Sequence, residues 1–456
     1  MALKASTEML FFIGDIHGQN DKLDSLLIEA DFLYEDRALS SYAHSQIVFL
    51  GDLIDNKLGN GAEHIATLQK VKALVDAGDA FCVMGNHEFN AIGWMLQKAN
   101  GEYCRSHTKA GNVKQHQLFL DQVVENSEEH HYWVNWFKSL PLLLDFETVR
   151  CIHACWDQDS VDKLKPYLNA DNSLKDEYWY DAFDSSHELY QLCETLLKGP
   201  EIELPEGYSF NDKNGVERRH LRVGWWKSYA ETYQQIGIVQ PSERKHIPDL
   251  PLPSELQGKN IEVPVVVGHY TLPPPPNTLP KPLSESVICV DYNAASKDGK
   301  LVGYFMSLDD DEDELSTRVS EENFVFCDAP DISSHIDFGT FEIMASYIDS
   351  LAHLNNEPSE VTEKLAIHVQ NTLLVDWDPL YVGSCEELAD EYDAYVNDAI
   401  TLIQAEKPKE LAAYLFIAET IIIGKDASNH VRTKCQRIAH ELVCEWKSLN
   451  NVVGGK

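Results

Sequence analysis

Basic residues are scarce in this sequence of 456 residues, in which 37 Lys and Arg face 74 Asp and Glu and the formal net charge is −37. A field of this sign repels polyanions, so we expect no extended nucleic acid as a partner. Any phosphate-bearing substrate must therefore be attracted by a local positive group. Bound divalent cations would provide one.

Long apolar runs and a cysteine framework are also missing. No segment approaches the length that crosses a bilayer, and the N-terminus lacks a basic region followed by a long apolar core, so we expect no membrane span. The ten cysteines are scattered and predict a cytoplasmic protein with reduced thiols. Cys151 and Cys155 flank His153, and buried thiols are favoured there over a zinc site.

The composition is that of a folded protein, with 44% hydrophobic residues, and the length favours two domains. Strand and helix patterns alternate up to about residue 100, which indicates a mostly parallel sheet covered by helices. Amphipathic helical patterns fill residues 340–448. We predict a site-bearing α/β domain over 1–335, interrupted by an acidic, aromatic insertion over 158–260 that acts as a cap, and a helical accessory domain over 340–456.

Three apolar runs end on a glycine followed by groups that bind metals or protons. The stretches after these runs are Gly14-Asp15-Ile16-His17-Gly18-Gln19, Gly51-Asp52-Leu53-Ile54-Asp55 and Gly85-Asn86-His87-Glu88. One Asp-x-His after a strand can be a helix cap beside a backbone-bonded histidine. Three such endings instead favour one site at the carboxyl ends of the strands.

Two later strands add a histidine each: His153 follows Val149–Ile152, and His269 follows Val265–Val267 and Gly268. Residues 287–290 and 301–308 are expected to form paired strands. Four further histidines lack a strand end before them and are expected at the surface: His107, His116, His130 and His131.

The strand-end groups can be counted as a coordination problem. One metal takes Asp15 and His17, a second takes Asn86, His153 and His269, and Asp52 bridges the two. This mixture of carboxylate, amide and imidazole suits manganese, iron, zinc or cobalt. Two such ions about 3.5–4 Å apart clamp the attacking and departing oxygens of a phosphoryl displacement and lower the pKa of a bridging water. The reaction class implied is phosphoester hydrolysis.

His87 adjoins the ligand Asn86 but cannot easily share its metal. We predict that His87 projects toward the leaving-group oxygen as general acid and that Asp55 holds its imidazole. The alternative is that Asp55 caps a turn and His87 is structural.

In this order, the motifs ending in His17, Asp55, Glu88, His153 and His269 resemble those of the calcineurin-like metallophosphoesterases, and most of all their phosphoprotein-phosphatase branch. The resemblance covers about residues 8–330. It implies a four-layer α/β/β/α sandwich, a binuclear metal centre and attack by metal-bound hydroxide, with the ligand roles given above. The missing second histidine after His269 is a feature of the protein-phosphatase branch.

One departure concerns the phosphate. That branch usually places Arg-Gly after its second motif, whereas this sequence has Asn56 and Lys57. Lys57, or Arg222 from the insertion, is the candidate to bind phosphate. The substrate is then a phosphoprotein, a small phosphomonoester or a dinucleoside polyphosphate, and the remaining alternative is a non-catalytic regulatory protein with a retained metal site.

The C-terminal part has a weaker resemblance. Asp376-Trp377-Asp378-Pro379-Leu380, followed by Asp390-Glu391-Tyr392-Asp393, is similar to a small bacterial helical domain of unknown function. This match implies only a helical module, which we expect to serve either structural packing or the binding of a protein partner. We expect the whole protein to be bacterial.

Overall fold

The computed structural model describes residues 9–30, 32–35, 38–41, 45–55, 62–212, 215–253, 261–273, 280–296, 298–308, 319–326, 360–380, 390–423 and 429–453, with residues 5, 7, 344, 345, 348, 351, 382 and 388. The chain divides into two compact units, Met1–Cys327 and Asp328–Lys456. Among the described residues, no helix is both long and apolar enough to cross a membrane.

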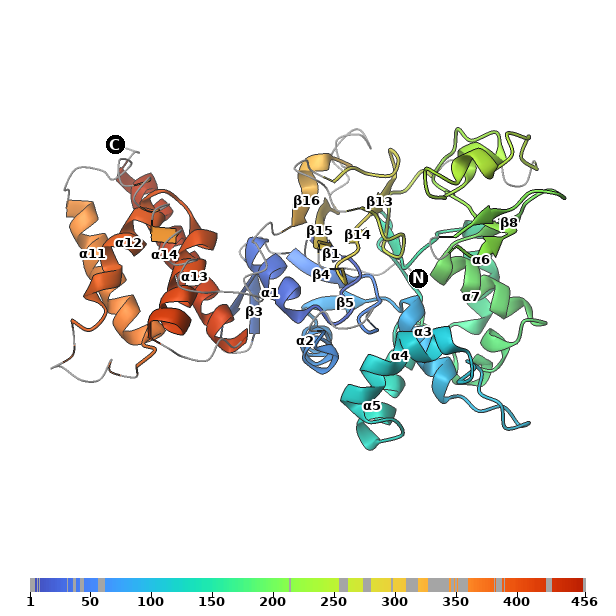
Figure 1. Ribbon diagram of the computed structural model, residues 1–456, viewed down its shortest axis with the longest axis horizontal. Coiled ribbons are helices and arrows are strands. Elements are labelled where there is room, and N and C mark those ends of the chain that lie inside the picture. Colours follow the sequence, from blue (N-terminus) through green and yellow to red (C-terminus); the bar gives the residue numbers. More distant parts are fainter. Residues whose placement is uncertain are drawn as a thin grey trace. The chain divides into compact units, whose positions relative to one another are not determined.

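The first unit is built on two sheets, drawn as arrows in Figure 1. The first sheet has the strand order β14-β15-β1-β4-β5, with β16 paired to β15. Strands β1, β4 and β5 are parallel, and β15 runs antiparallel to β1. The bounds are Met9–Ile13 for β1, Ser45–Phe49 for β4, Ala80–Cys82 for β5, Asp291–Tyr292 for β14, Lys300–Ser307 for β15 and Phe324–Phe326 for β16.

The second sheet has the order β13-β12-β7-β6. Strands β7, β12 and β13 are parallel, and β6 is antiparallel to β7. The bounds are Leu143–Asp145 for β6, Arg150–Ile152 for β7, Val265–Val267 for β12 and Val287–Cys289 for β13.

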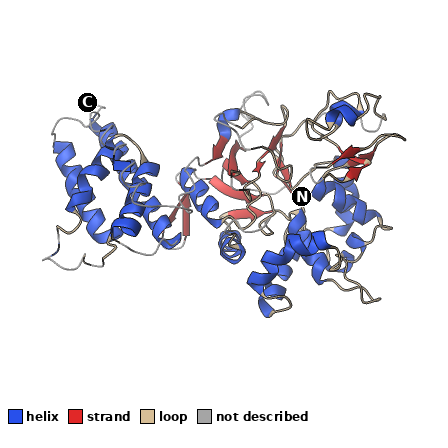
Figure 2. Ribbon diagram, in the orientation of Figure 1, coloured by secondary structure: helices blue, strands red, loops and turns tan. Residues whose placement is uncertain are grey.

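Alternating side chains show how the layers are stacked. Leu10 and Phe12 of β1 belong to a buried cluster with Val266 and Ile288 of the second sheet, so the two sheets face each other through these side chains. Phe11 and Ile13 point the other way, into a cluster with side chains of the surrounding helices. Helices lie beside the strands of this unit in Figure 2. The predicted four-layer α/β/β/α sandwich is confirmed.

Helices connect and cover these strands. Their bounds are Asn20–Glu29 for α1, His64–Ala77 for α2, Asn86–Met95 for α3, Ala110–Val123 for α4, Glu128–Lys138 for α5, Gln158–Leu164 for α6 and Glu188–Lys198 for α7. A hairpin of β2 (Phe32–Glu35) and β3 (Ala38–Ser41) follows α1.

The predicted pairing of residues 287–290 with 301–308 is wrong. Strand β13 pairs with β12 in the second sheet, whereas β15 pairs with β14 in the first. The chain passes from one sheet to the other between Cys289 and Asp291. There the Asp291 carboxylate accepts the backbone N–H groups of Thr271 and Asn293 and so fixes the crossing.

The region predicted as an insertion contains short elements besides α6 and α7: β8 (Glu201–Glu203), β9 (Phe210–Asn211), β10 (Glu217–Arg218), β11 (His220–Arg222) and α8 (Tyr233–Ile236). It has a small hydrophobic cluster that includes Leu204, Leu221 and Ile236. Trp225 joins it to the two histidine-bearing turns, because its Nε1–H lies 3.1 Å from the Ala154 carbonyl oxygen and 2.9 Å from the Tyr270 hydroxyl.

In the second unit, the described residues from 360 onward form helices and connecting turns (Figure 2). The helices are α11 (Glu360–Thr372), a π-helical turn (Leu373–Trp377), α12 (Asp393–Gln404), α13 (Pro408–Ile417), a second π-helical turn (Ala418–Ile422) and α14 (Asn429–Val453). The helical C-terminal part is thus confirmed. In the Trp-Asp-Pro stretch, Trp377 is buried against Tyr392, whose hydroxyl donates to Asp378 at 2.9 Å.

Candidate active site

The six strand-end groups are gathered where the two sheets meet. Backbone hydrogen bonds tie neighbouring turns together: the N–H of His17 donates to Asp52 O at 2.9 Å, and that of Gly268 donates to His153 O at 2.9 Å. His153 joins the sheets, because its Nδ1 lies 2.7 Å from the carbonyl oxygen of Leu50. The carboxyl ends of β1, β4, β5, β7 and β12 therefore build one site.

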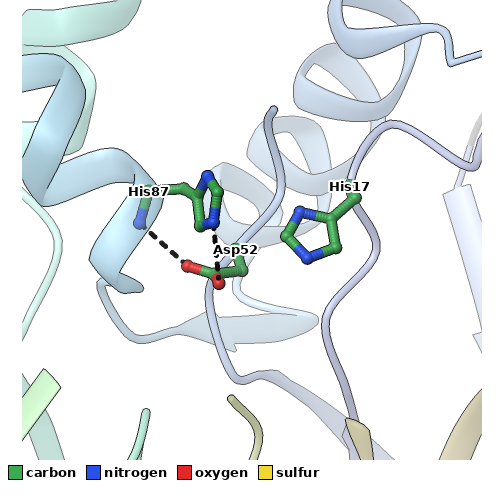
Figure 3. Close-up of side chains that lie close together, drawn as sticks. All are labelled: His17, Asp52 and His87. Atoms are coloured by element: carbon green, nitrogen blue, oxygen red, sulfur yellow. Dashed lines mark hydrogen bonds and ion pairs between the residues drawn. The ribbon is translucent and has the colours of Figure 1, made fainter. Parts of the chain in front are cut away.

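His17, Asp52 and His87 form the first group, shown in Figure 3, and their ligand atoms lie within 4.8 Å of one another. His17 is oriented by its Nδ1, which is 2.9 Å from the carbonyl oxygen of Ile54. Asp52 accepts the backbone N–H of His87 at 2.9 Å, and its other oxygen lies 3.7 Å from His87 Nε2 (Figure 3).

Asp52, His153 and His269 form the second group within the same 4.8 Å limit. His153 Nε2 lies 3.2 Å from Asn86 Oδ1 and 3.3 Å from Asp52 Oδ1, which places Asn86 at this group. Asp52 is common to both groups. Burial alone would raise the pKa of Asp52, but the charges of His153 and His87 outweigh burial and hold it well below its usual value.

Asp15 belongs to neither of the two groups found among the described residues. Its carboxylate accepts the backbone N–H of His269, at 3.0 and 3.2 Å. Burial, and then the charges of Asp291 and Asp52, raise the pKa of Asp15 well above its usual value. Asp291 is a buried carboxylate that the sequence analysis missed, although it follows an apolar strand as the predicted groups do.

The donor set fits divalent metal ions. Three buried carboxylates, Asp15, Asp52 and Asp291, interact electrostatically there, which a bound cation would relieve. His269 Nε2 is buried and has no hydrogen-bond partner among the described residues, as a nitrogen reserved for a ligand would be. The nearby carboxylate, amide and imidazole groups are ligands that borderline divalent metals accept.

His87 and Asp55 form a close pair, with His87 Nδ1 2.9 Å from Asp55 Oδ2. Burial would lower the pKa of His87, but the charge of Asp52 and the bond to Asp55 raise it to about 9. Burial would raise the pKa of Asp55, yet His116 and then His87 lower it below its usual value. The imidazole is thus protonated and the carboxylate ionised at neutral pH in the metal-free protein.

Glu88 has a role that the sequence analysis did not find. Its buried carboxylate accepts backbone N–H groups of Asp52 and Leu53 at 2.8 Å and of Gly85 at 3.0 Å. Glu88 therefore joins the turn after β4 to the turn that begins α3. Burial, and then the charge of Asp52, raise its pKa to about 7.

The expectation that four histidines lie at the surface is wrong for two of them. His116 and His130 are buried, at 2% and 0% exposure, in α4 and α5. His107 is partly buried and stacks on Trp94 and on Tyr103, each at 3.8 Å between ring centroids. Only His131 is exposed, as expected. The apolar faces of α4 and α5 bury these rings, which strand-end reasoning could not detect.

Of the two basic candidates for phosphate binding, Arg222 falls within the described residues. Lys57 lies outside the described residues. Arg222 ends β11 in the insertion and is partly buried. The pKa of His269 is lowered well below its usual value by burial, then by His153 and then by Arg222, so the Arg222 charge lies near the second group.

The model of the calcineurin-like phosphoesterase family matches residues 10–292. Among solved structures, the chain is similar to a candidate diadenosine tetraphosphatase, with 16% identity over 67% of this chain and 92% of that one and a TM-score of 0.32. It is also similar to a cold-active protein tyrosine phosphatase of a psychrophilic Shewanella species, with 19% identity over 67% and 78% and a TM-score of 0.36.

A protein serine/threonine phosphatase from Saccharomyces cerevisiae shares 13% identity over 71% of this chain and 80% of that one, with a TM-score of 0.35. No curated protein matches the chain. Because all three TM-scores are low, assignment depends on the family match, which spans more than half of the chain and includes all six strand-end groups. The chain therefore belongs to the calcineurin-like phosphoesterase family and is a phosphoester hydrolase.

Proposed function

We propose that the protein is a metal-dependent phosphatase in which two divalent ions share Asp52 and His87 donates a proton to the leaving group. The observation that carries this proposal is that Asp52 is common to two groups of ligand atoms, each within 4.8 Å. His87 of the first group is reserved for the proton, so Asp15, whose carboxylate lies at the His269 turn, would join His17 and Asp52 in holding one ion. Asp52, Asn86, His153 and His269 would hold the other. Bound there, the ions would polarise the phosphoryl group and supply a water of lowered pKa.

Backbone carbonyl groups orient the imidazoles of His17 and His153 for metal binding. The Leu50 and Ile54 carbonyl oxygens, at 2.7 and 2.9 Å, accept the Nδ1–H of His153 and His17, which leaves each Nε2 free to bind a metal. Manganese is our first choice of metal, with iron, zinc or cobalt as alternatives.

His87 is suited to donate a proton. Its Nδ1–H is taken up by Asp55 at 2.9 Å, so its Nε2, on the Asp52 side, is the nitrogen that gives the proton to the departing oxygen. Arg222, whose charge lies near His269, would bind the phosphate of a small molecule or phosphoprotein substrate. A cytoplasmic location and a bacterial source remain predictions from the sequence.

The test is hydrolysis of p-nitrophenyl phosphate by metal-stripped protein to which Mn²⁺ is restored. We expect Mn²⁺ to restore activity. Asp52→Asn should bind metal less well and lower kcat at least a hundredfold, because both groups of ligand atoms share this carboxylate. His87→Ala should keep the metal and lose about 10²–10⁴ in kcat. His131→Ala, which changes an exposed histidine, is the matched control and should behave as the wild type.

Two outcomes contradict the proposal. If Mn²⁺ binds stoichiometrically but no phosphomonoester is cleaved, the protein is not a phosphatase of this kind. If diadenosine tetraphosphate yields nucleotide products while monoesters yield no inorganic phosphate, it is a dinucleoside polyphosphate hydrolase.

A further inference from the structure

The carboxylate behind His87 serves two imidazoles. Asp55 Oδ2 lies 2.9 Å from His87 Nδ1, and Asp55 Oδ1 lies 2.8 Å from His116 Nδ1. The Asp55 side chain is only 1% exposed, so these imidazoles stand where water would otherwise bind. Each carboxylate oxygen therefore has its own imidazole.

Among the described residues, the one hydrogen bond of the His116 imidazole goes to Asp55. Its ring lies in α4, near Trp94 and Phe119 at centroid distances of 5.4 and 5.3 Å. Its Nε2 is buried without a hydrogen-bond partner in the described part of the chain. An ionised carboxylate can only accept, so His116 carries its proton on Nδ1 and donates it to Asp55.

Without this donor, Asp55 Oδ1 would be a buried acceptor with no partner in the described part of the chain. Such a group costs about 1–3 kcal/mol, and the carboxylate would rotate or admit water to satisfy it. Either change would move Oδ2 away from His87 Nδ1. The imidazole of His87 would then lose the bond that orients its ring and aims its Nε2.

We propose that His116 is a positioning residue for the general acid: it fixes Asp55, and Asp55 fixes His87. The inference rests on the proposed function, in which His87 donates a proton to the leaving group. The competing explanation is that His116 merely fills the space between α3 and α4.

Leaving groups of different acidity separate the two explanations. Phenyl phosphate releases a phenolate whose conjugate acid has a pKa of about 10 and needs a proton, whereas 2,4-dinitrophenyl phosphate releases a stable anion that does not. We expect His116→Leu to lower kcat on phenyl phosphate at least tenfold and kcat on the dinitrophenyl ester less than twofold. Phe119→Leu, a matched change on the same buried face of α4, should affect both substrates equally.

A conservative pair keeps the test valid if His116→Leu does not fold. An Asn side chain places its N–H where His Nδ1 stands, and a Gln side chain places it nearer Nε2. We expect the kcat of His116→Asn to stay within threefold of the wild-type value on both substrates. His116→Gln should show the selective loss on phenyl phosphate.

A spectroscopic measurement tests the geometry without turnover. In metal-free protein, ¹⁵N NMR of the imidazoles should show His87 and His116 protonated at Nδ1, with Nδ1–H protons shifted downfield by the carboxylate. His116→Leu and His116→Gln should remove this signature from His87, and His116→Asn should retain it.

The inference is overturned if His116→Leu and His116→Gln lower kcat equally on both substrates, or leave the NMR signals of His87 unchanged. His87→Ala, measured alongside, tells the two failures apart. If His87→Ala shows the selective loss and the His116 variants do not, only this inference fails. If His87→Ala shows no dependence on the leaving group, the general acid of the proposed function fails, and this inference fails with it.

Discussion

Four residues of the site have a strained backbone conformation. His17, Asp52, Asp55 and His269 have positive φ angles of 50°, 51°, 63° and 69°, in the left-handed region that non-glycine residues rarely adopt. Each such residue costs about 1–2 kcal/mol and persists only where surrounding contacts enforce it. Glu88 supplies such contacts to the turn after β4, and Asp15 does so for His269. The strained backbone thus lowers the stability of the folded protein but orients these side chains toward the site.

Gly268 shows how tightly the Asp15 and His269 turns fit. A Cβ atom at this position would stand 2.1 Å from Asp15 Oδ1, so Gly268→Ala must displace the carboxylate or the turn. We expect Mn²⁺ affinity, measured by isothermal titration calorimetry, to fall at least tenfold while far-UV circular dichroism stays unchanged.

Gly111→Ala is the matched control, because a Cβ there would meet nothing within 4 Å and the residue lies in α4. It should leave Mn²⁺ affinity unchanged and stabilise the protein by up to about 1 kcal/mol. Equal affinity in Gly268→Ala and wild type would show that Asp15 takes no part in binding metal.

Which site residues the sequence predicts follows from how local their signals are. Asp15, His17, Asp52, Asn86, His153 and His269 each follow an apolar run, and a strand end is visible in a few residues of sequence. His116 is not predictable in this way, because its partner Asp55 is 61 residues away and only folding brings α4 against that turn. Asp291 does follow an apolar run, but the incorrect strand pairing concealed it.

At the scale of elements, the sequence predicts buried strands better than it predicts their partners. The parallel core of β1, β4 and β5 follows from the alternation of strands and helices. The sheet change between Cys289 and Asp291 does not, since two neighbouring apolar runs look the same whether they pair or part. It is the second sheet that brings His153 and His269 to Asp52.

Helix α5 contains a buried histidine, His130, that is neutral at pH 7. The His130 side chain is fully buried, and its Nδ1 accepts the backbone N–H of Asn126 at 3.1 Å. The backbone N–H of His130 donates to Ser127 Oγ, the helix cap, at 3.0 Å. Burial, and then the charge of His116, lower the pKa of His130 from 6.5 to about 4.

Because the folded state then binds fewer protons than the unfolded state between pH 6.5 and about 4, this residue must reduce stability as pH falls through that window. We expect the loss in free energy of unfolding between pH 7 and pH 5 to be smaller in His130→Asn than in wild type, by on the order of 1 kcal/mol. His131→Asn, exposed on the same helix, should match the wild type.

Urea titrations of metal-free protein, followed by tryptophan fluorescence, measure this difference. The signal reports mainly the first unit, since Trp377 and Trp446 are the only two of the nine tryptophans that lie beyond residue 327. Parallel pH profiles for His130→Asn and wild type would mean that His130 titrates normally in the folded protein.

At the scale of the whole molecule, each unit has a hydrophobic core of its own. In the described part of the chain, one cluster runs from Ile348 to Trp446, and the clusters around the two sheets contain no residue beyond Phe326. The site uses residues of the first unit alone. We therefore propose, as the sequence suggested, that residues from about 340 onward form an accessory domain that the chemistry does not need.

This proposal predicts the behaviour of fragments. Residues 1–327 should fold, bind Mn²⁺ and hydrolyse p-nitrophenyl phosphate with kcat/KM within about threefold of the full chain, because all six proposed metal ligands, His87 and Asp55 are present and no core is cut. Residues 328–456 should give a helical circular dichroism spectrum and unfold cooperatively. If residues 1–327 fold and bind metal but lose activity, the helical unit acts on the site and is not an accessory. If they aggregate, the two cores depend on each other and the division into domains is wrong.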